Sequence, residues 1–387
     1  MNNNALVNSF FARYADSAVS PSLFFAPGRV NLIGEHTDYN GGYVLPCALT
    51  FGTYLAIRRT NDSLVKFSTT NFDFSVSIPL HALSTKIDGQ WVNYPLGVIN
   101  QFIKRGLEIG GMELLFSGNI PNGAGLSSSA SIELVTAVAI NDLFQFNLDK
   151  WELVKLSQKA ENEFVGMNCG IMDQFASAMG KKDNALFLDC NSLTYEYAPF
   201  VLTGYELIIT NSNKKRGLVD SKYNERRQQC EKAVECINKV QPLANLGSIT
   251  LTGFQKVQDI IVDQTVRKRA LHVVSEDQRV VEAVEALKNN DLLAFGQLMN
   301  QSHVSMRENF EITCFEIDTL VEEAQKLKGV IGSRMTGGGF GGCIISLVET
   351  DETTAFCERL SETYLRKTGL TADHYIAQIG DGAKQIS

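Results

Sequence analysis

The sequence predicts an α+β protein of two lobes. Its 387 residues suit two or three domains of ordinary size. Short strand-like stretches mix with helices in the first half, whereas long helical stretches dominate from Ser221 onward. We place a boundary near residue 200, which gives an N-terminal lobe of residues 1–200 and a C-terminal lobe of residues 201–387.

In the N-terminal lobe, hydrophobic spacing separates strands from helices. Short apolar runs, one of them with alternating polar residues, predict strands, and apolar residues at helical spacing predict helices. The expected helices are 6–16, 93–105, 128–144 and 151–164. The expected strands are 23–26, 43–45, 53–58, 65–69, 72–78, 112–117 and 185–189.

In the C-terminal lobe, a strand at 207–211 comes before a series of longer helices. A glycine cluster separates two further strands, and a helix and a last strand follow it. The expected helices are 222–240, 267–288, 292–308, 314–327 and 355–368, and the remaining strands are 330–335, 343–348 and 374–379.

Composition and charge exclude several classes of protein. Hydrophobic residues make up 44% of the chain and charged residues 20%, as in ordinary globular proteins. The net charge of −8 disfavours a generic nucleic-acid or anionic-membrane surface. No apolar run approaches the roughly 20 residues of a membrane span. We therefore expect neither nucleic acid nor membrane as a partner.

Cysteine and histidine usage predicts a reduced compartment and no zinc site. The eight cysteines are scattered without a CxxC pair, and the N-terminus lacks the pattern of a signal peptide. Reduced cytoplasmic thiols therefore explain them better than disulfides. The five histidines are isolated from one another.

Residues 121–130, here called the serine loop, predict an anion site. Gly123 and Gly125 stand between an expected strand and an expected helix, and three serines follow them. Such glycines let the backbone approach an anion, and free N–H groups at the helix start can donate to it. A serine-capped helix after a tight turn explains the pattern equally well.

Residues 334–343, here called the glycine loop, contain five glycines in the six positions after Thr336. A tight strand-to-helix or strand-to-strand turn is the simpler interpretation. The functional one is a loop pressed against a ligand or the other lobe.

Residues 26–40, here called the polar motif, are the densest polar segment. The motif combines Arg29, Glu35, His36 and Asp38 between glycines. Carboxylates accept hydrogen bonds from neighbouring hydroxyls, and histidine can donate or accept, which suits a small polyol such as a sugar. A solvated loop with incidental charges is the alternative.

Residues 168–175, here called the acidic segment, contain one acid, Asp173, in an otherwise uncharged run. It is a candidate for a shielded carboxylate, or simply a helix N-terminal Asp favoured by the helix dipole. Glu161 lies upstream on an expected helix, where a glutamate would normally face solvent.

The order and spacing of these motifs resemble a known enzyme family. Residues 28–39 resemble the galactokinase signature. Residues 123–130 and 336–343 resemble motifs of the wider family of homoserine, mevalonate and phosphomevalonate kinases, and the similarity covers essentially the whole chain. The resemblance implies an N-terminal α+β lobe with a left-handed crossover, a ferredoxin-like C-terminal lobe and an active site between them.

The resemblance also implies an activity and a sugar site. The activity is ATP-dependent phosphorylation of the anomeric hydroxyl of α-D-galactose. Asp173 corresponds to the proton acceptor, and Arg29 to the cation beside it. The implied sugar contacts are Glu35, His36, Thr37, Asp38, Gly170 and Tyr223.

A nucleotide site with Mg²⁺ is implied in the same way. Ser129 and Glu161 correspond to the magnesium ligands, and Trp91, Tyr94 and Ser68 to residues near the adenine. The implied phosphate contacts are Gly123, Ala124, Gly125, Leu126, Ser127, Ser128 and Ser129.

Two other functions stay open. An N-acetylgalactosamine kinase would share this motif set, and a non-catalytic sensor of galactose and ATP would regulate transcription. The pair Ser129-Ala130, together with Asp173 and Arg29, favours an enzyme over a sensor. We expect a monomer in the cytoplasm.

Overall fold

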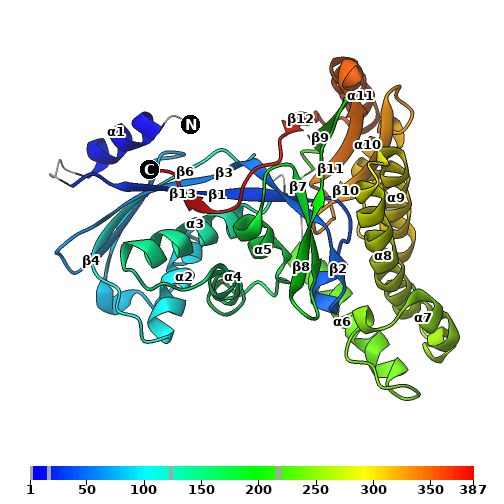
Figure 1. Cartoon of the computed structure of the whole chain (residues 1–387), viewed down its shortest axis with the longest axis horizontal. Helices are drawn as coiled ribbons and strands as arrows, with labels where there is room; N and C mark the ends of the chain where they lie inside the picture. The colour runs from blue at the N-terminus through cyan, green and yellow to red at the C-terminus, as the bar shows by residue number, and fades with distance from the viewer. Residues whose placement is uncertain (1–2, 15–18, 122–124, 215–218) are drawn as a thin grey trace.

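The computed structural model of the chain describes residues 3–14, 19–121, 125–214 and 219–387. A six-stranded sheet lies at one end of the molecule, in the order β13-β1-β3-β6-β4-β5 (Figure 1). Its neighbours are antiparallel except β4 and β6, which are parallel. The strands are β1 (Ser22–Asn31), β3 (Pro46–Arg59), β4 (Leu64–Thr69), β5 (Ser75–Pro79), β6 (Met112–Gly118) and β13 (Lys384–Gln385).

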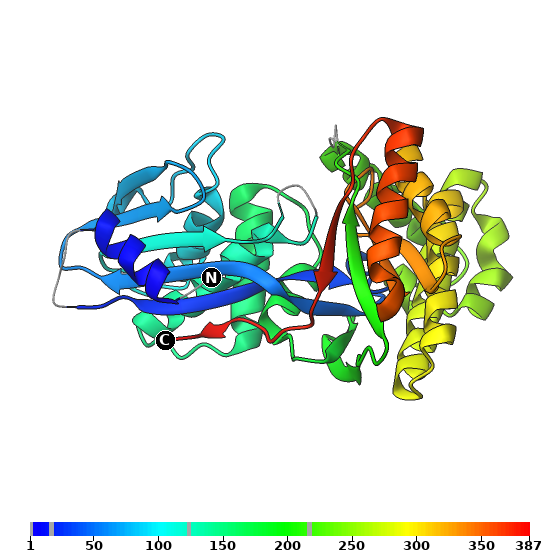
Figure 2. The ribbon, with the colours of Figure 1, turned by 90° about the horizontal axis from the view of Figure 1, so that it is seen from above.

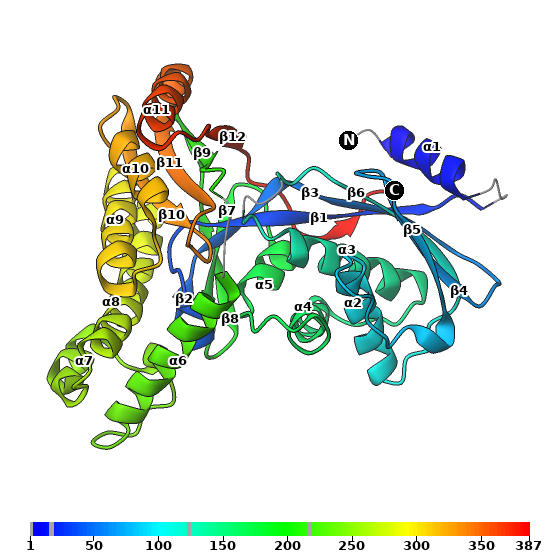
Figure 3. The same cartoon turned by 180° about the vertical axis from the view of Figure 1, so that it is seen from behind.

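Helices cover both faces of this sheet because successive strand residues point to opposite sides. On β1, Leu23 packs with Phe10 of α1 (Asn3–Arg13), whereas Phe24 belongs to the larger core on the other face. Figure 3 shows α1 alone on its face, opposite four helices. Those four are α2 (Asn93–Lys104), α3 (Ser128–Leu143), α4 (Lys150–Lys159) and α5 (Met172–Met179).

A second, antiparallel sheet has the order β10-β11-β9-β12, and a small sheet has the order β2-β7-β8. The strands of the second sheet are β9 (Tyr205–Asn211), β10 (Val330–Thr336), β11 (Cys343–Glu349) and β12 (Asp373–Ala377). Those of the small sheet are β2 (Tyr43–Val44), β7 (Asn184–Asp189) and β8 (Thr194–Pro199). The remaining helices are α6 (Val219–Ile237), α7 (Leu251–Val257), α8 (Gln264–Lys288), α9 (Leu292–Ser305), α10 (Phe315–Ala324) and α11 (Thr353–Thr368).

One hydrophobic core joins the two halves of the molecule. Val30 and Leu32 of the polar motif pack in the same buried cluster as Ile209 of β9 and Ile345 of β11. Ile344, which precedes Ile345 on β11, points to the opposite face of the second sheet and packs with the helices there. The polar motif is therefore held between the sheets by burial of apolar side chains.

The end of the chain returns to the first sheet. β13 pairs with β1, and Figure 2 shows this last segment running back beside the strands that open the chain. The division near residue 200 stays a prediction, and residues 384–385 belong to the first sheet. No helix within the described ranges is long and apolar enough to cross a membrane.

The α+β prediction agrees with this architecture, and the differences are local. The expected helix 151–164 ends as an α-helix at Lys159 and continues as a π-helical turn, Ala160–Val165. The expectation missed β8, whose residues are mostly exposed, and the short elements α5, α7 and β13. Both differences arise where burial is small or the element is short.

Candidate active site

A cavity of about 420 Å³ lies where the polar motif, the serine loop, the acidic segment and the glycine loop meet. It brings together many residues that the sequence predicted for one site. The predicted residues along its walls are Arg29, Glu35, His36, Asp38, Gly125, Leu126, Ser127, Ser128, Ser129, Glu161, Gly170, Asp173 and Tyr223.

Arg29 and Asp173 form a bidentate ion pair at this cavity. Arg29 Nε donates to Asp173 Oδ1 at 2.9 Å and Nη2 donates to Oδ2 at 3.0 Å. The Arg29 side chain is only 6% exposed, whereas that of Asp173 is 27% exposed. Two parallel charge-assisted bonds fix both position and orientation, so the carboxylate is held in place while one side stays accessible.

The serine loop also holds this pair. Arg29 Nη1 donates to the Gly125 carbonyl at 2.8 Å, and Ser127 Oγ donates to Asp173 Oδ2 at 2.5 Å. Ser127 precedes α3 with a left-handed backbone and makes no side-chain cap. The serine-capped helix is therefore not what forms here, and the first N–H groups of α3 remain available to an anion.

Asp38 and Gly170 form a second polar wall. A Cβ on Gly170 would overlap the Asp38 carboxylate, so only glycine leaves room for this acid. Burial, and then the negative charge of Asp173, raise the pKa of Asp38 to about 6. A ligand hydroxyl that donates to this carboxylate would compensate for its lost hydration.

His36 lies beside Asp38 as a neutral ring. Burial lowers the pKa of His36 to about 3. Its Nδ1 lies 2.7 Å from the hydroxyl of Tyr39, and its ring centroid lies 5.0 Å from that of Tyr223. The backbone of His36 has φ of 62°, an uncommon region for a residue with a side chain. Such strain is typical of residues held for a function.

Glu35 is buried, and protein donors surround its carboxylate. Asn31 Nδ2 donates to Oε2 at 2.8 Å, the N–H of Gly337 donates to Oε1 at 2.9 Å, and Arg334 forms an ion pair with Oε2. The glycine loop therefore forms the turn between β10 and β11, as the simpler interpretation expected, and it also contacts the polar motif directly.

Ser129 and Glu161 supply the oxygen atoms predicted for a cation. The Glu161 side chain lies on the π-helical turn and is almost fully buried, and both Glu161 and Ser129 line the cavity. Burial and the negative charge of Asp173 raise the pKa of Glu161. Gln174 Nε2 also donates to Glu161 Oε2 at 2.6 Å. The pair fits a hard cation such as Mg²⁺, which prefers oxygen ligands and retains several waters.

The structure places four predicted residues away from the cavity walls. The hydroxyl of Thr37 lies within hydrogen-bond distance of the Gly34 and Tyr43 carbonyls, so it stabilises the turn of the polar motif. Ser68 is fully buried and bonded to Tyr14 and Leu114.

The other two are the aromatic residues predicted near the adenine. The Trp91 ring packs edge-on against Phe116 with centroids 5.3 Å apart. Tyr94 lies in the first turn of α2. Neither lines the cavity. Their place near a nucleotide stays a prediction, and Gly123 and Ala124 lie outside the described residues.

Residues without a predicted role also hold carboxylates of the site. Arg334 and Gln174 hold the carboxylates of Glu35 and Glu161 respectively. The sequence marks each of them in one way: Arg334 is the charged residue of the glycine loop, and Gln174 directly follows the lone acid of an otherwise uncharged run.

Comparisons with known proteins agree with this geometry. Residues 8–59 match the family model described as the galactokinase galactose-binding signature. Residues 93–181 and 283–365 match the N-terminal and C-terminal domains of the GHMP kinases. The galactokinase of Fusobacterium nucleatum is 53% identical over 94% of this chain and 94% of its own length. This chain belongs to the galactokinase family. The galactokinase of Bacillus subtilis is 49% identical, again over 94% of this chain and 94% of its own length.

Solved structures also support the membership of this chain in the galactokinase family. The crystal structure of Lactococcus lactis galactokinase complexed with galactose superposes with a TM-score of 0.96, at 43% identity over 99% of both chains. The mevalonate kinase of Methanococcus jannaschii has a TM-score of 0.67 at 20% identity, which shows the shared fold alone, over 94% of this chain and all of that one. The predicted galactokinase resemblance, the α+β fold and the class of ATP-dependent sugar kinase are confirmed.

Proposed function

We propose that this galactokinase-family chain transfers the γ-phosphoryl group of ATP to the anomeric hydroxyl of α-D-galactose. One observation carries the proposal: Asp173, held by Arg29, lies between the sugar-type groups of the polar motif and the serine loop. A proton acceptor and an anion site therefore face one cavity, as a kinase requires.

Asp173 removes the proton of the attacking hydroxyl. The anomeric oxygen forms a bond to the γ-phosphorus, the bond from that phosphorus to the β–γ bridging oxygen breaks, and ADP leaves. The proton passes to an Asp173 oxygen, and the positive charge of Arg29 stabilises the carboxylate before transfer. Because Arg29 also bonds the Gly125 carbonyl, acceptor and nucleotide loop keep a fixed relation.

The sugar contacts are Asp38, His36, Glu35, Gly170 and Tyr223. Asp38 accepts from sugar hydroxyls, and Gly170 provides the space in which that carboxylate lies. The aromatic face of Tyr223 and the neutral His36 ring close the same side. Buried polar groups that lose their hydroxyl partners discriminate strongly between sugars.

The serine loop and Ser129 bind the nucleotide phosphates with Mg²⁺. Ser129 and Glu161 would hold the cation, which offsets negative charge on the phosphates when it is bound. Within the described residues, no cluster of three or more His, Cys, Asp or Glu side chains could hold a metal. A mixed serine–glutamate site completed by phosphate oxygens and water is therefore the arrangement we propose.

The test is ADP release measured with galactose, N-acetylgalactosamine, glucose and mevalonate, each with and without Mg²⁺. We expect rapid, Mg²⁺-dependent release with galactose and little with the others. Preference for N-acetylgalactosamine would make the chain the alternative kinase. Binding of galactose and ATP without release would favour the non-catalytic sensor.

We also propose a cytoplasmic monomer. All eight cysteines are free, which suits a reducing compartment. Size-exclusion chromatography with light scattering measures the molar mass, and a value near 42.7 kDa is expected. A mass of twice that value would contradict the monomer.

A further inference from the structure

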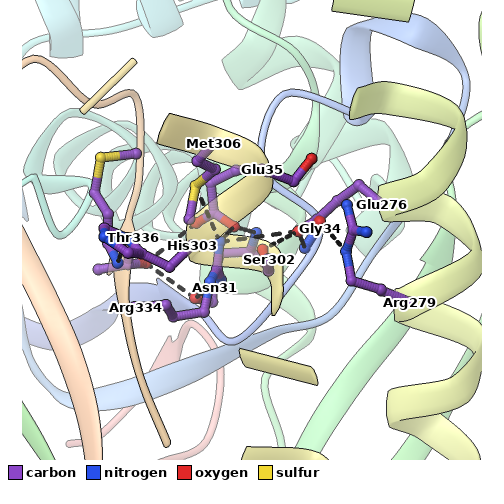
Figure 4. A network of polar contacts seen from close by, with 12 residues as sticks. Asn31, Gly34, Glu35, Glu276, Arg279, Ser302, His303, Met306, Arg334 and Thr336 are labelled. Carbon is purple, nitrogen blue, oxygen red and sulfur yellow. Dashed lines mark hydrogen bonds and ion pairs between the residues drawn. The ribbon is translucent and has the colours of Figure 1, made fainter. Parts of the chain in front are cut away.

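A buried ion-pair network connects the second sheet to the polar motif (Figure 4). At its centre is Arg334 of β10, whose side chain is fully buried. Arg334 Nη1 donates to the Leu32 carbonyl at 2.8 Å, and Nη2 forms the ion pair with Glu35. A cation from β10 therefore binds both the backbone and the acid of the polar motif.

The Glu35 carboxylate depends on that cation. Its other donors are the Asn31 amide and the Gly337 N–H, at 2.8 and 2.9 Å. These donors are neutral, whereas Arg334 supplies the nearby positive charge. Removal of one partner from a buried ion pair leaves an uncompensated charge, which is strongly unfavourable.

A second carboxylate holds the same turn from α8. Glu276 accepts from the Gly34 N–H at 3.0 Å and from Ser302 Oγ at 2.5 Å. Arg279 Nε donates to Glu276 at 2.8 Å, and Arg334 lies 4.0 Å from it. Figure 4 shows the two carboxylates on either side of Gly34. The residues immediately before His36 are therefore fixed from both sides.

We propose that Arg334 is a positioning residue for the sugar site, an inference that rests on the proposed function. It does not line the cavity. It fixes Glu35 and hence the turn whose next residues, His36 and Asp38, face the cavity. Its guanidinium makes several directed bonds at once, which a lysine ammonium cannot reproduce in the same geometry.

The test substitutes Arg334→Lys, which keeps the charge and loses the geometry. We expect the galactose KM and the calorimetric Kd for galactose to rise by about tenfold to hundredfold, since small misplacements at a site have effects of this order. The ATP KM should stay within about twofold, because Arg334 bonds to Asn31, Leu32 and Glu35 and to none of the described residues of the serine loop. This split distinguishes positioning from general loss of structure.

Arg269→Lys is the matched control. Arg269 is also a buried arginine of the second half, with an ion pair to Glu311 at 2.7 Å and a bond to the Asn309 carbonyl at 2.6 Å. It does not line the cavity. Its substitution should lower the midpoint of thermal unfolding and leave the galactose KM within about twofold.

Three outcomes separate the claims. Wild-type galactose affinity in folded Arg334→Lys, or equal increases in both KM values, would overturn the positioning role alone. If Arg334→Lys does not fold, the pair Arg334→Met/Glu35→Gln removes both charges, and wild-type galactose affinity there would overturn the role as well. A wild-type enzyme without galactose-dependent ADP release would instead refute the proposed function and this inference with it.

Discussion

Arg29 and Asp173 lie 144 positions apart in the sequence and meet as a doubly hydrogen-bonded pair in the cavity. Arg29 comes from β1 beside an irregularity in its pairing with β3, and Asp173 lies in the first turn of α5. The sheet and the helix therefore meet at the carboxylate that we propose as the proton acceptor.

Asp173→Asn tests this role with nearly unchanged volume. We expect kcat to fall by about 10²–10⁴-fold, the range for loss of a positioned acid or base. Galactose and ATP should still bind, because the surrounding donors remain. ADP release measures kcat, and titration calorimetry measures both affinities. Turnover near that of the wild type would remove Asp173 from the acceptor role.

Gly170→Ala tests the space beneath Asp38. The added methyl group would overlap the Asp38 carboxylate, so we expect the galactose KM to rise by about tenfold or more while the ATP KM changes little. Gly118→Ala is the control, since its Cβ would meet only Asn71 Oδ1 at 3.9 Å. Equal galactose KM values in the two variants would mean that Asp38 is not held as described.

Asp38 also predicts how pH affects the enzyme. The pKa of Asp38 is raised from 3.8 to about 6, so the unliganded folded protein binds this proton more tightly than the unfolded chain does. Through this group, the free energy of unfolding should decrease as pH rises from about 4 to 6. If galactose binds the ionised form, its affinity should fall about tenfold per pH unit below 6.

The measurement is galactose Kd between pH 4.5 and 8, in the wild type and in Asp38→Asn. The variant should bind more weakly and should lack this pH dependence. If the wild-type Kd for galactose stays constant across this range, protonation of Asp38 is not coupled to galactose binding.

Local chemistry in the sequence marked the polar motif as a candidate sugar site, with a solvated loop as the alternative, and the family resemblance implied where the site lies. Arg29, Glu35, His36 and Asp38 are dense polar residues that a solvated loop does not require, and all four line the cavity. The strands and longer helices were predictable because apolar residues recur along them with the period of a strand or of a helix.

The remaining partners depend on tertiary contacts that sequence spacing does not reveal. Arg334 meets Glu35 across 299 positions, and neither element carries a signal for the other. Thr37 shows the converse, since a hydroxyl inside a dense polar motif satisfies backbone carbonyls instead of facing the cavity. Local composition identifies which residues are chemically capable, whereas the fold decides which of them face the ligand.

The proposed cation site predicts a metal effect. Glu161→Gln removes the charged oxygen ligand, so we expect the Mg²⁺ concentration for half-maximal activity to rise by about tenfold or more. Glu163→Gln is the control on the same turn, where Glu163 is half-exposed and pairs with Lys104. ADP release against Mg²⁺ concentration measures both variants, and identical curves would exclude Glu161 as a ligand.

Ser68→Ala tests whether Ser68 has a structural role or the role near the adenine that the family resemblance implied. Its hydroxyl lies 2.8 Å from that of Tyr14 and 3.3 Å from the Leu114 carbonyl, in a fully buried position. Loss of such a buried bond is worth about 1 kcal/mol or slightly more, so Ser68→Ala should lower the free energy of unfolding by that amount. Denaturant titration measures this change.

Tyr14→Phe should have a similar effect, since it removes the other hydroxyl. The ATP KM should stay at the wild-type value in both variants. A raised ATP KM with unchanged stability in Ser68→Ala alone would instead return Ser68 to the adenine site.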